Sequence, residues 1–195
     1  MGRERIITDT SLLVGTAFRI IDDEGFGNFS ARKLAGVLGI SHMTVYNYMA
    51  REELLNQVVI QAFSIMNGNI MPHVEEYKTG HREPNRIFSV IADELLVFAK
   101  THQNIYKFVF LERIGAARDD PRLRALYMSG MEWVRDAIPA DRFDSMYNDV
   151  YLFLVLINGL VLAYLNRQND AAEAMCRNNM ARAFKLILGH YCTDV

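Results

Sequence analysis

Apolar residues recur every three or four positions along most of the chain, which is the spacing of one face of an α-helix. A first helix ends at Gly25, and its apolar face is formed by Leu13, Ala17, Ile20 and Ile21. Runs of alternating apolar and polar residues flanked by hairpin turns, which would indicate paired β-strands, do not occur. The pattern therefore predicts an all-α fold.

Beyond residue 50 the same period continues to the C-terminus. It predicts a long helix over residues 51–71 that stops near Pro72, because proline interrupts helical hydrogen bonding. The polar residues 77–84 are predicted to form a loop. Five further helices are expected over residues 85–101, 104–114, 121–137, 142–167 and 170–191.

Two short helical patterns flank the segment Gly39-Ile40-Ser41. Gly39 suits the left-handed conformation that ends a helix, and Ser41 suits the N-cap of the next one. A short glycine turn between two helices is typical of a helix-turn-helix, whose second helix can enter the major groove of DNA. Helix pairs with a glycine turn also occur in all-α proteins that do not bind DNA.

The outer face of the second short helix distinguishes these two interpretations. If Val45 and Met49 face inward, the outward side chains are His42, Met43, Thr44, Asn47 and Tyr48, with Tyr46 at the margin. A helix that needs only solubility carries Glu and Lys, and this face carries no formal charge. Asn can make two hydrogen bonds to adenine, Thr and Met can contact a thymine methyl group, and Tyr can bind phosphate. The composition of this face favours DNA recognition.

The N-terminal segment resembles the DNA-binding domain of the TetR (tetracycline repressor) family of bacterial transcription regulators. The resemblance covers about residues 8–58 and depends on several short motifs together: Asp23-Glu24-Gly25, Phe29-Ser30, Arg32-Lys33-Leu34-Ala35, Leu38-Gly39-Ile40-Ser41, Thr44-Val45-Tyr46 and Glu52-Glu53-Leu54-Leu55. The chain departs from the family pattern at Tyr48-Met49, where a His-aromatic pair is usual. It also has only Ala50 before Arg51, where the family has a two-residue loop before a lysine.

The resemblance implies a DNA-binding domain over residues 1–50 and a helical effector-binding and dimerisation domain over residues 51–195. It implies phosphate contacts from Ser30, Arg32 and Arg51. The expected partners are a pseudo-palindromic double-stranded DNA operator, a second copy of the chain, and a small-molecule effector that releases the DNA. The expected activity is that of a repressor. Activation remains an alternative, because the position of the operator decides whether bound protein lowers or raises transcription.

Residues 150–165, VYLFLVLINGLVLAYL, form the most apolar stretch. We expect this helix to be buried between its own domain and the partner subunit, and the alternatives are an intrachain core helix and a membrane span. A span needs about 20 apolar residues, and Asn158-Gly159 interrupts the stretch. By the resemblance, the last two helices form a four-helix bundle in the dimer, with interface residues Leu152, Leu156, Gly159, Ala163, Ala181 and Phe184.

The larger domain is rich in Met, Phe and Tyr, which often line apolar pockets. The candidate effector-binding residues are Met66, Phe88, Phe110, Tyr127, Trp133 and Asn158. No cluster of acids or arginines in the sequence selects a charged ligand, so a large, mostly apolar or aromatic effector is favoured. At helical spacing, such residues are also ordinary core residues.

Charge and composition limit the remaining possibilities. From Met1 to Gln57 there are six Arg and Lys against seven acids, so non-specific DNA affinity should be modest. Cys176 and Cys192 form no disulfide framework, and a cytoplasmic protein with reduced thiols and no membrane association is expected. No phosphate-binding glycine loop or zinc motif is present, so we expect neither an enzyme nor a cofactor.

Two interpretations of other classes remain. His73, His81 and His102 fall in one region and are the candidates for a metal site, although we expect no metal. A helical adaptor or interaction protein that does not bind DNA is the main alternative. An adaptor would have no reason to display Thr44, Asn47 and Tyr48 together.

Overall fold

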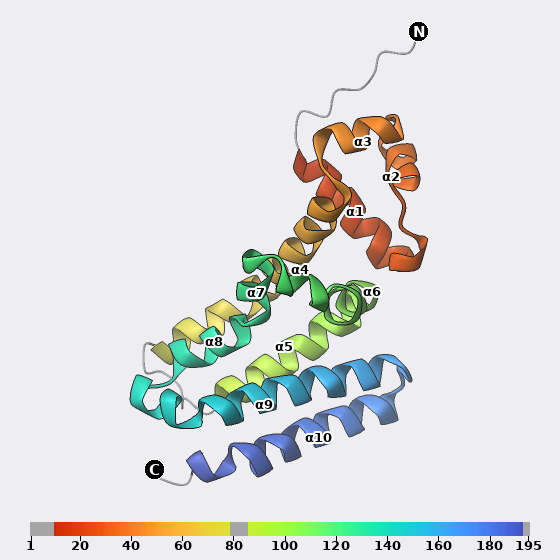
Figure 1. Ribbon diagram of the computed structural model, residues 1–195. Coiled ribbons are helices and arrows are strands. Elements are labelled where there is room, and N and C mark those ends of the chain that lie inside the picture. Colours follow the sequence, from red (N-terminus) through yellow and green to blue (C-terminus); the bar gives the residue numbers. More distant parts are fainter. Residues whose placement is uncertain (1–9, 79–85, 193–195) are drawn as a thin grey trace. The chain divides into compact units, whose positions relative to one another are not determined.

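The computed structural model describes residues 10–78 and 86–192, and all regular elements within these ranges are helical (Figure 1). The all-α prediction is confirmed. The α-helices are α1 (Thr10–Glu24), α2 (Ala31–Leu38), α3 (His42–Tyr48), α4 (Arg51–Lys78), α5 (Ile87–Thr101), α6 (Gln103–Lys107), α7 (Pro121–Tyr127), α8 (Ser129–Ala137), α9 (Ala140–Leu165) and α10 (Asp170–Ile187). Shorter turns are η1 (Phe26–Asn28), η3 (Phe108–Glu112), η4 (Ile114–Arg118) and η5 (Gly189–Cys192).

The described residues form two compact units. The first contains residues 10–64 together with 102–126, and the second contains residues 65–101 and 127–192 apart from the undescribed segment 79–85. The boundary between the units falls inside α4, whereas the sequence analysis placed a functional boundary at residue 50. That functional division stays a prediction.

The first unit is built around the inner face of α1. Leu13, Ala17 and Ile21 are fully buried, and they lie with Leu34 of α2 and Val45 of α3 in one apolar core. The expected inward face of α1 is therefore confirmed. Burying several aliphatic side chains of this size contributes about 1.5–3 kcal/mol each, which fixes the short helices α2 and α3 against a longer one.

Local hydrogen bonds set the ends of α2 and α3 as the sequence predicts. Gly25 has φ 81° and follows the last residue of α1, and Gly39 has φ 69° and ends α2. The Ser30 and Ser41 hydroxyl oxygens accept hydrogen bonds from the backbone N–H of Lys33 and Thr44, each at 3.1 Å. These bonds satisfy N–H groups that have no partner within the helix.

Gly39 and Gly36 allow a matched test of the turn. Gly39→Ala should lower the free energy of unfolding by about 1–2 kcal/mol, because a β-carbon disfavours the left-handed conformation. Gly36 lies inside α2 with open space around its Cα, so Gly36→Ala should raise the free energy of unfolding by about 0.5–1 kcal/mol. Urea unfolding followed by circular dichroism measures both. Equal effects of the same sign would contradict this account of the turn.

Residues 102–126 belong to the first unit, which the sequence pattern does not indicate. His102 Nδ1 lies 2.6 Å from Oδ2 of Asp22, and the Asn104 side-chain amide donates to the Asp22 carbonyl oxygen at 2.7 Å. The ring of Phe108 packs against that of Phe26, with the centroids 4.8 Å apart. Residues separated by about 80 positions therefore meet at the C-terminal end of α1.

A second polar cluster joins the start of α4 to the same segment. Arg113 donates to Glu52 at 2.9 Å, and Arg122 donates to both oxygens of Glu53 at 2.7 and 3.1 Å. Arg122 also bonds the Asp120 carboxylate. The hydrogen bonds from Arg122 lower the pKa of Glu53 and bring the pKa of Asp120 to about 2. The carboxylates of Glu53 and Asp120 are consequently ionised and paired with Arg122 at neutral pH.

The second unit packs α5, α8 and α10 against α9. Phe88 of α5 and Phe153 of α9 are fully buried and meet edge to face, with ring centroids 5.5 Å apart. At the surface, Lys100 Nζ lies 2.6 Å from a carboxylate oxygen of Glu173, which links α5 to α10. The core of this unit is therefore aromatic, and its rim is charged.

The predicted stop at Pro72 is wrong, because α4 continues to Lys78. Ile70, Val74 and Tyr77 are buried, so the apolar face of α4 continues past the proline. Burial of that face offsets the about 3 kcal/mol that an interior proline costs. Tyr77 and Lys78 of the predicted loop are helical, and residues 79–84 lie outside the described residues.

Other helices differ from the predicted ranges in length. The expected helix 104–114 is α6 followed by a π turn, and the expected helix 121–137 is divided at Met128 into α7 and α8. At Gly130 a β-carbon would lie 3.0 Å from Leu154 of α9, so α8 approaches α9 closely just after the break. α9 begins two residues earlier than expected, at Ala140, and α10 ends at Ile187.

Candidate nucleic-acid interface

α3 presents one buried and several exposed side chains. Val45 is fully buried, and Met49, which follows the helix as its C-cap, is half-buried. His42, Met43 and Asn47 are exposed, and 60% of Met43 is accessible to solvent. The apolar contact that holds α3 therefore leaves the opposite side of the helix open.

The solvent exposure of the two tyrosines of α3 is the reverse of the prediction. Tyr46 is exposed and Tyr48 is half-buried, whereas the sequence analysis placed Tyr48 outward and Tyr46 at the margin. The reason is geometric, because each residue turns the helix by about 100°. Tyr48 is three residues from Val45 and therefore lies beside the buried face. Thr44 is also half-buried, and its hydroxyl lies 2.7 Å from that of Ser41.

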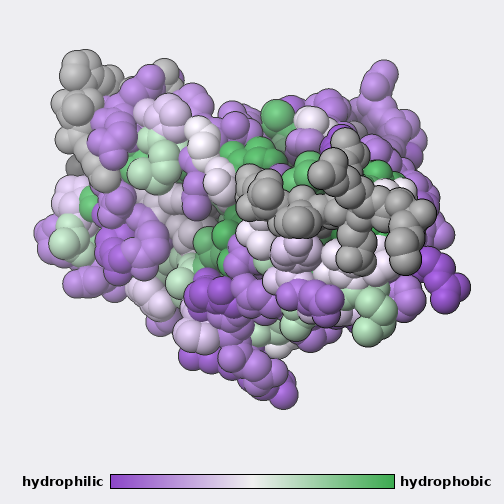
Figure 2. All heavy atoms as spheres, turned by 90° about the horizontal axis from the view of Figure 1, so that it is seen from above, coloured by the Kyte–Doolittle hydropathy of each residue, from purple (hydrophilic) through white to green (hydrophobic). Residues whose placement is uncertain are grey.

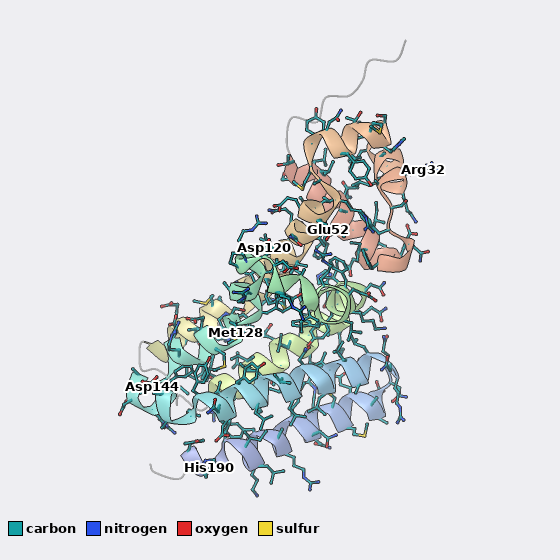
Figure 3. All side chains as sticks on the ribbon, in the orientation of Figure 1. Arg32, Glu52, Asp120, Met128, Asp144 and His190 are labelled. Carbon is teal, nitrogen blue, oxygen red and sulfur yellow. The ribbon has the colours of Figure 1, made fainter. Side chains whose placement is uncertain are left out.

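The candidate phosphate-binding residues lie at the N-terminal ends of α2 and α4. Ser30 caps α2 and remains exposed, and the exposed side chain of Arg32 extends away from this helix (Figure 3). Lys33 forms an ion pair with Glu24, so its charge is largely neutralised. Arg51 is exposed and is the first residue of α4, with one of its nitrogens 3.9 Å from a Glu52 oxygen.

The link between α3 and α4 has two non-helical residues. Met49 has φ −156° and ψ 131°, so α3 ends at Tyr48 and both Met49 and Ala50 precede Arg51. The sequence analysis counted Ala50 alone in this loop. α3 is one residue shorter than that count assumed, and the loop is one residue longer.

The acids near this surface are engaged by residues of the 102–126 segment. Arg113 pairs with Glu52 and Arg122 pairs with Glu53, as described above. Their charges are thus offset within the first unit, which reduces the repulsion of DNA phosphates that seven acids in the N-terminal segment would suggest. The sequence contains these residues about 60 positions apart and gives no local signal of their pairing.

The six candidate effector residues do not gather at one site. Met66, Phe88 and Trp133 are buried, and the indole N–H of Trp133 donates to the Asn67 side-chain oxygen at 3.0 Å. Phe110 belongs to the first unit and packs on Phe63 and Tyr106. Tyr127 and Asn158 are half-buried in the second unit.

Of these six residues, Phe88 alone lines the cavity of about 590 Å³ between α5, α9 and α10. Most of the lining of this cavity was not predicted from the sequence, because residues of α9 and α10 meet the start of α5, which lies far from them in the chain. The other lining residues are Arg86, Ser89, Ala92, Asp93, Phe153, Arg177 and Met180, together with Ala181 and Phe184, which were assigned to the dimer interface.

The candidate interface residues of α9 lie on an exposed apolar strip. We define this strip as Tyr151, Leu152, Val155, Leu156, Gly159 and Ala163, all of which are exposed in the single chain. Leu152 and Leu156 expose 53% and 40% of their surface. Ala181 and Phe184 of α10 instead face the cavity beside α5. Ala163 borders a different hollow, which Met175 of α10 also lines.

By length and composition, α9 could cross a membrane. One helix of this kind is weak evidence for a membrane span. Only 28% of its most apolar 18-residue window is buried, so α9 is not an internal core helix of this chain. Figure 2 shows other apolar residues interspersed among polar ones on the face seen from above. In the single chain, the exposed apolar strip of α9 contacts solvent unless another surface packs against it.

Two of the candidate metal-binding histidines have a carboxylate beside them. His73 Nε2 lies 3.9 Å from a Glu94 oxygen, and His102 contacts Asp22. His81 lies outside the described residues. Among residues 10–78 and 86–192, no group of three or more His, Cys, Asp and Glu side chains is arranged to hold a metal ion.

No protein-family model matches this chain, and no curated protein matches it. The hypothesis of DNA binding therefore depends on the residues of α2, α3 and the start of α4. The all-α fold is compatible with that hypothesis and does not by itself specify a function.

Proposed function

We propose that this protein is a ligand-responsive transcription regulator of the TetR type that binds a pseudo-palindromic operator as a homodimer and acts as a repressor. One observation carries the proposal: α3 is a short, capped helix whose exposed residues His42, Met43, Tyr46 and Asn47 are uncharged groups suited to base edges and phosphates.

Physical chemistry favours this role over that of a solvated helix. An exposed helix gains stability and solubility from pairs of opposite charges three or four residues apart, and α3 has none. Large exposed groups such as Met43 and Tyr46 gain most when a partner surface covers them. A groove that offers hydrogen-bond acceptors and thymine methyl groups matches both kinds of side chain.

Phosphate contacts would position α3 in the groove. Arg32 and Arg51 are exposed cations on helices that flank α3, and the Ser30 hydroxyl lies at a helix start, where backbone N–H groups favour anions. With so few cations, the dependence of affinity on salt should be shallow, because each phosphate contact contributes a slope of about −0.9.

Dimerisation would supply the second half of the recognition surface. The apolar strip on α9 is the surface that a second copy would cover, and Met175 and Leu186 are further exposed apolar residues on α10. Small residues at Gly159 and Ala163 allow helices to approach closely. Two reading helices related by a two-fold axis match half-sites about 34–36 Å apart, or a multiple of that spacing.

An effector would act by binding the DNA-competent and DNA-incompetent forms with different affinities. The resulting coupling is reciprocal, so operator DNA must weaken effector binding by the same factor. α4 contributes residues to both compact units, and Arg51 at its start is assigned to a phosphate contact. The proposal assigns the protein to the cytoplasm, where its DNA target is available.

Footprinting on a fragmented genomic library tests the proposal. The purified protein should enrich a small set of fragments and protect a palindromic sequence in each, with the two halves equally protected. A helical adaptor would enrich no sequence above a control lacking protein, and that result would reject DNA recognition. The genes beside the protected sites would then indicate which compounds to examine as effectors.

A further inference from the structure

The cavity between α5, α9 and α10 has an aromatic lining. Phe88 and Phe153 are fully buried, and Phe184 completes the group with ring centroids 5.7 Å from Phe88 and 6.2 Å from Phe153. Met180 and Ala92 add further buried apolar surface. A volume of about 590 Å³ falls in the range of small-molecule sites, which are mostly apolar with a few polar groups.

The polar groups of this cavity are arranged unevenly along α5. Arg86 and Ser89 lie at its start, and Asp93 lies two turns further on, where it pairs with Arg177 of α10. Arg177 also pairs with Glu173, so its charge is offset. Arg86 is exposed and forms no ion pair with any carboxylate of the described residues. One end of the cavity therefore carries a positive charge that is not offset by an ion pair.

The distance along α5 limits the length of a ligand. Arg86 and Asp93 are seven residues apart, which corresponds to about 10 Å at about 1.5 Å per residue. Phe88 and Ala92 lie between them on the wall of the cavity. An elongated molecule that fills this space would have an apolar body about 10 Å long and one anionic end.

We propose that this cavity binds an elongated amphipathic carboxylate, with its carboxylate at Arg86 and its apolar body along Ala181 and Phe184, where Phe184 packs on the buried rings of Phe88 and Phe153. This ligand class adds an anionic end to the large, mostly apolar or aromatic effector that the sequence favours, because the fold places Arg86 at the edge of an apolar site. The binding site stands on its own geometry, and only the role of the carboxylate as an effector rests on the proposed function.

The site is separate from the strip proposed for dimerisation. Ala181 and Phe184 face α5, whereas Ala163 of the strip borders a different hollow, together with Met175. A ligand can therefore occupy the cavity without displacing residues of the strip. Binding should have a stoichiometry of one carboxylate per chain, whether the protein is a monomer or a dimer.

Calorimetric titration of the full chain with octanoate and octanamide tests the proposal without DNA. The two probes have the same length and differ in charge. Octanoate should bind about fivefold more tightly than octanamide, as expected for a charge pair at a solvent-exposed rim. Arg86→Gln should remove this preference. Arg182→Gln, which changes an exposed arginine of α10 outside the cavity lining, should retain it.

A second variant tests occupancy of the cavity. Ala181 is exposed and lines the cavity, so Ala181→Trp should fill it and weaken both probes by at least about tenfold without loss of helical content. Ala171→Trp, at an exposed position of the same helix outside the lining, is the control. Equal binding of the probes by the wild type, a preference unchanged in Arg86→Gln, or the absence of octanoate binding would each overturn the proposal.

The outcome is distinguishable from that of the proposed function. If the protein binds octanoate with these properties and enriches no DNA, the carboxylate site is supported and the regulator proposal is rejected. If the protein protects a palindrome and does not bind octanoate, the carboxylate site alone is rejected.

Discussion

Replacing Leu152 and Leu156 together by Arg should convert a dimer into monomers and weaken operator binding by about 10²- to 10⁴-fold. Both side chains are exposed in the single chain, so the protomer should keep its fold. Two charges on each partner would face one another across a two-fold interface without compensating groups. Loss of the second reading head removes the gain from linked binding sites, which accounts for the size of the effect.

Sedimentation equilibrium measures the change in mass, and the same samples can be titrated with operator DNA. Val97→Arg is the control, since Val97 is an exposed apolar residue of α5 outside the strip. It should leave both the mass and the DNA affinity unchanged. A double variant that remains a dimer would show that another surface joins the subunits.

Asn47→Ala should relax base preference at particular operator positions, with a loss of about 1–3 kcal/mol for the preferred base. Tyr46→Phe combined with Arg51→Ala should instead weaken binding to all sequences and make the salt dependence shallower by about one unit of slope. The difference is expected because Asn47, which is exposed on α3, is assigned to base edges in the proposal, whereas the other two side chains are assigned to phosphates.

Competition titrations against a library of single-base operator variants, repeated at several salt concentrations, separate the two effects. Asn69→Ala changes an exposed asparagine on α4 in the second unit and should alter neither quantity. If Asn47→Ala weakens every sequence by the same factor, Asn47 is not involved in base recognition.

Local features of the fold were predictable from the sequence. Gly25, Ser30, Gly39 and Ser41 act through φ angles and hydrogen bonds within four residues, and the structure places each as expected. The inward face of α1 could also be predicted from the sequence, because the spacing of its apolar residues is a local property. Pro72 was misjudged, since tertiary burial of Val74 and Tyr77 outweighs a local helix-breaking preference.

Contacts between distant residues were not predictable in this way. The pairing of Glu53 with Arg122 joins positions 69 residues apart, and no single-sequence pattern records it. The same reason applies to the cavity, where Arg86 and Arg177 come from different helices. The exposure of His42, Met43 and Asn47 follows from the local period of one short helix, whereas the prediction for Tyr46 and Tyr48 was wrong and the candidate ligand site depends on the packing of three helices.

The membership of residues 102–126 in the first unit has a consequence for synthesis of the chain. A ribosome releases α1 and η1 early, yet the residues that contact Asp22 and Phe26, namely His102, Asn104 and Phe108, emerge many residues later. Domains generally fold as units during translation, so the first unit is complete only after a segment encoded in the middle of the gene has emerged. Deleting residues 102–126 would leave Asp22 and Phe26 without these contacts, and a fragment ending at residue 64 should be less stable than the intact unit.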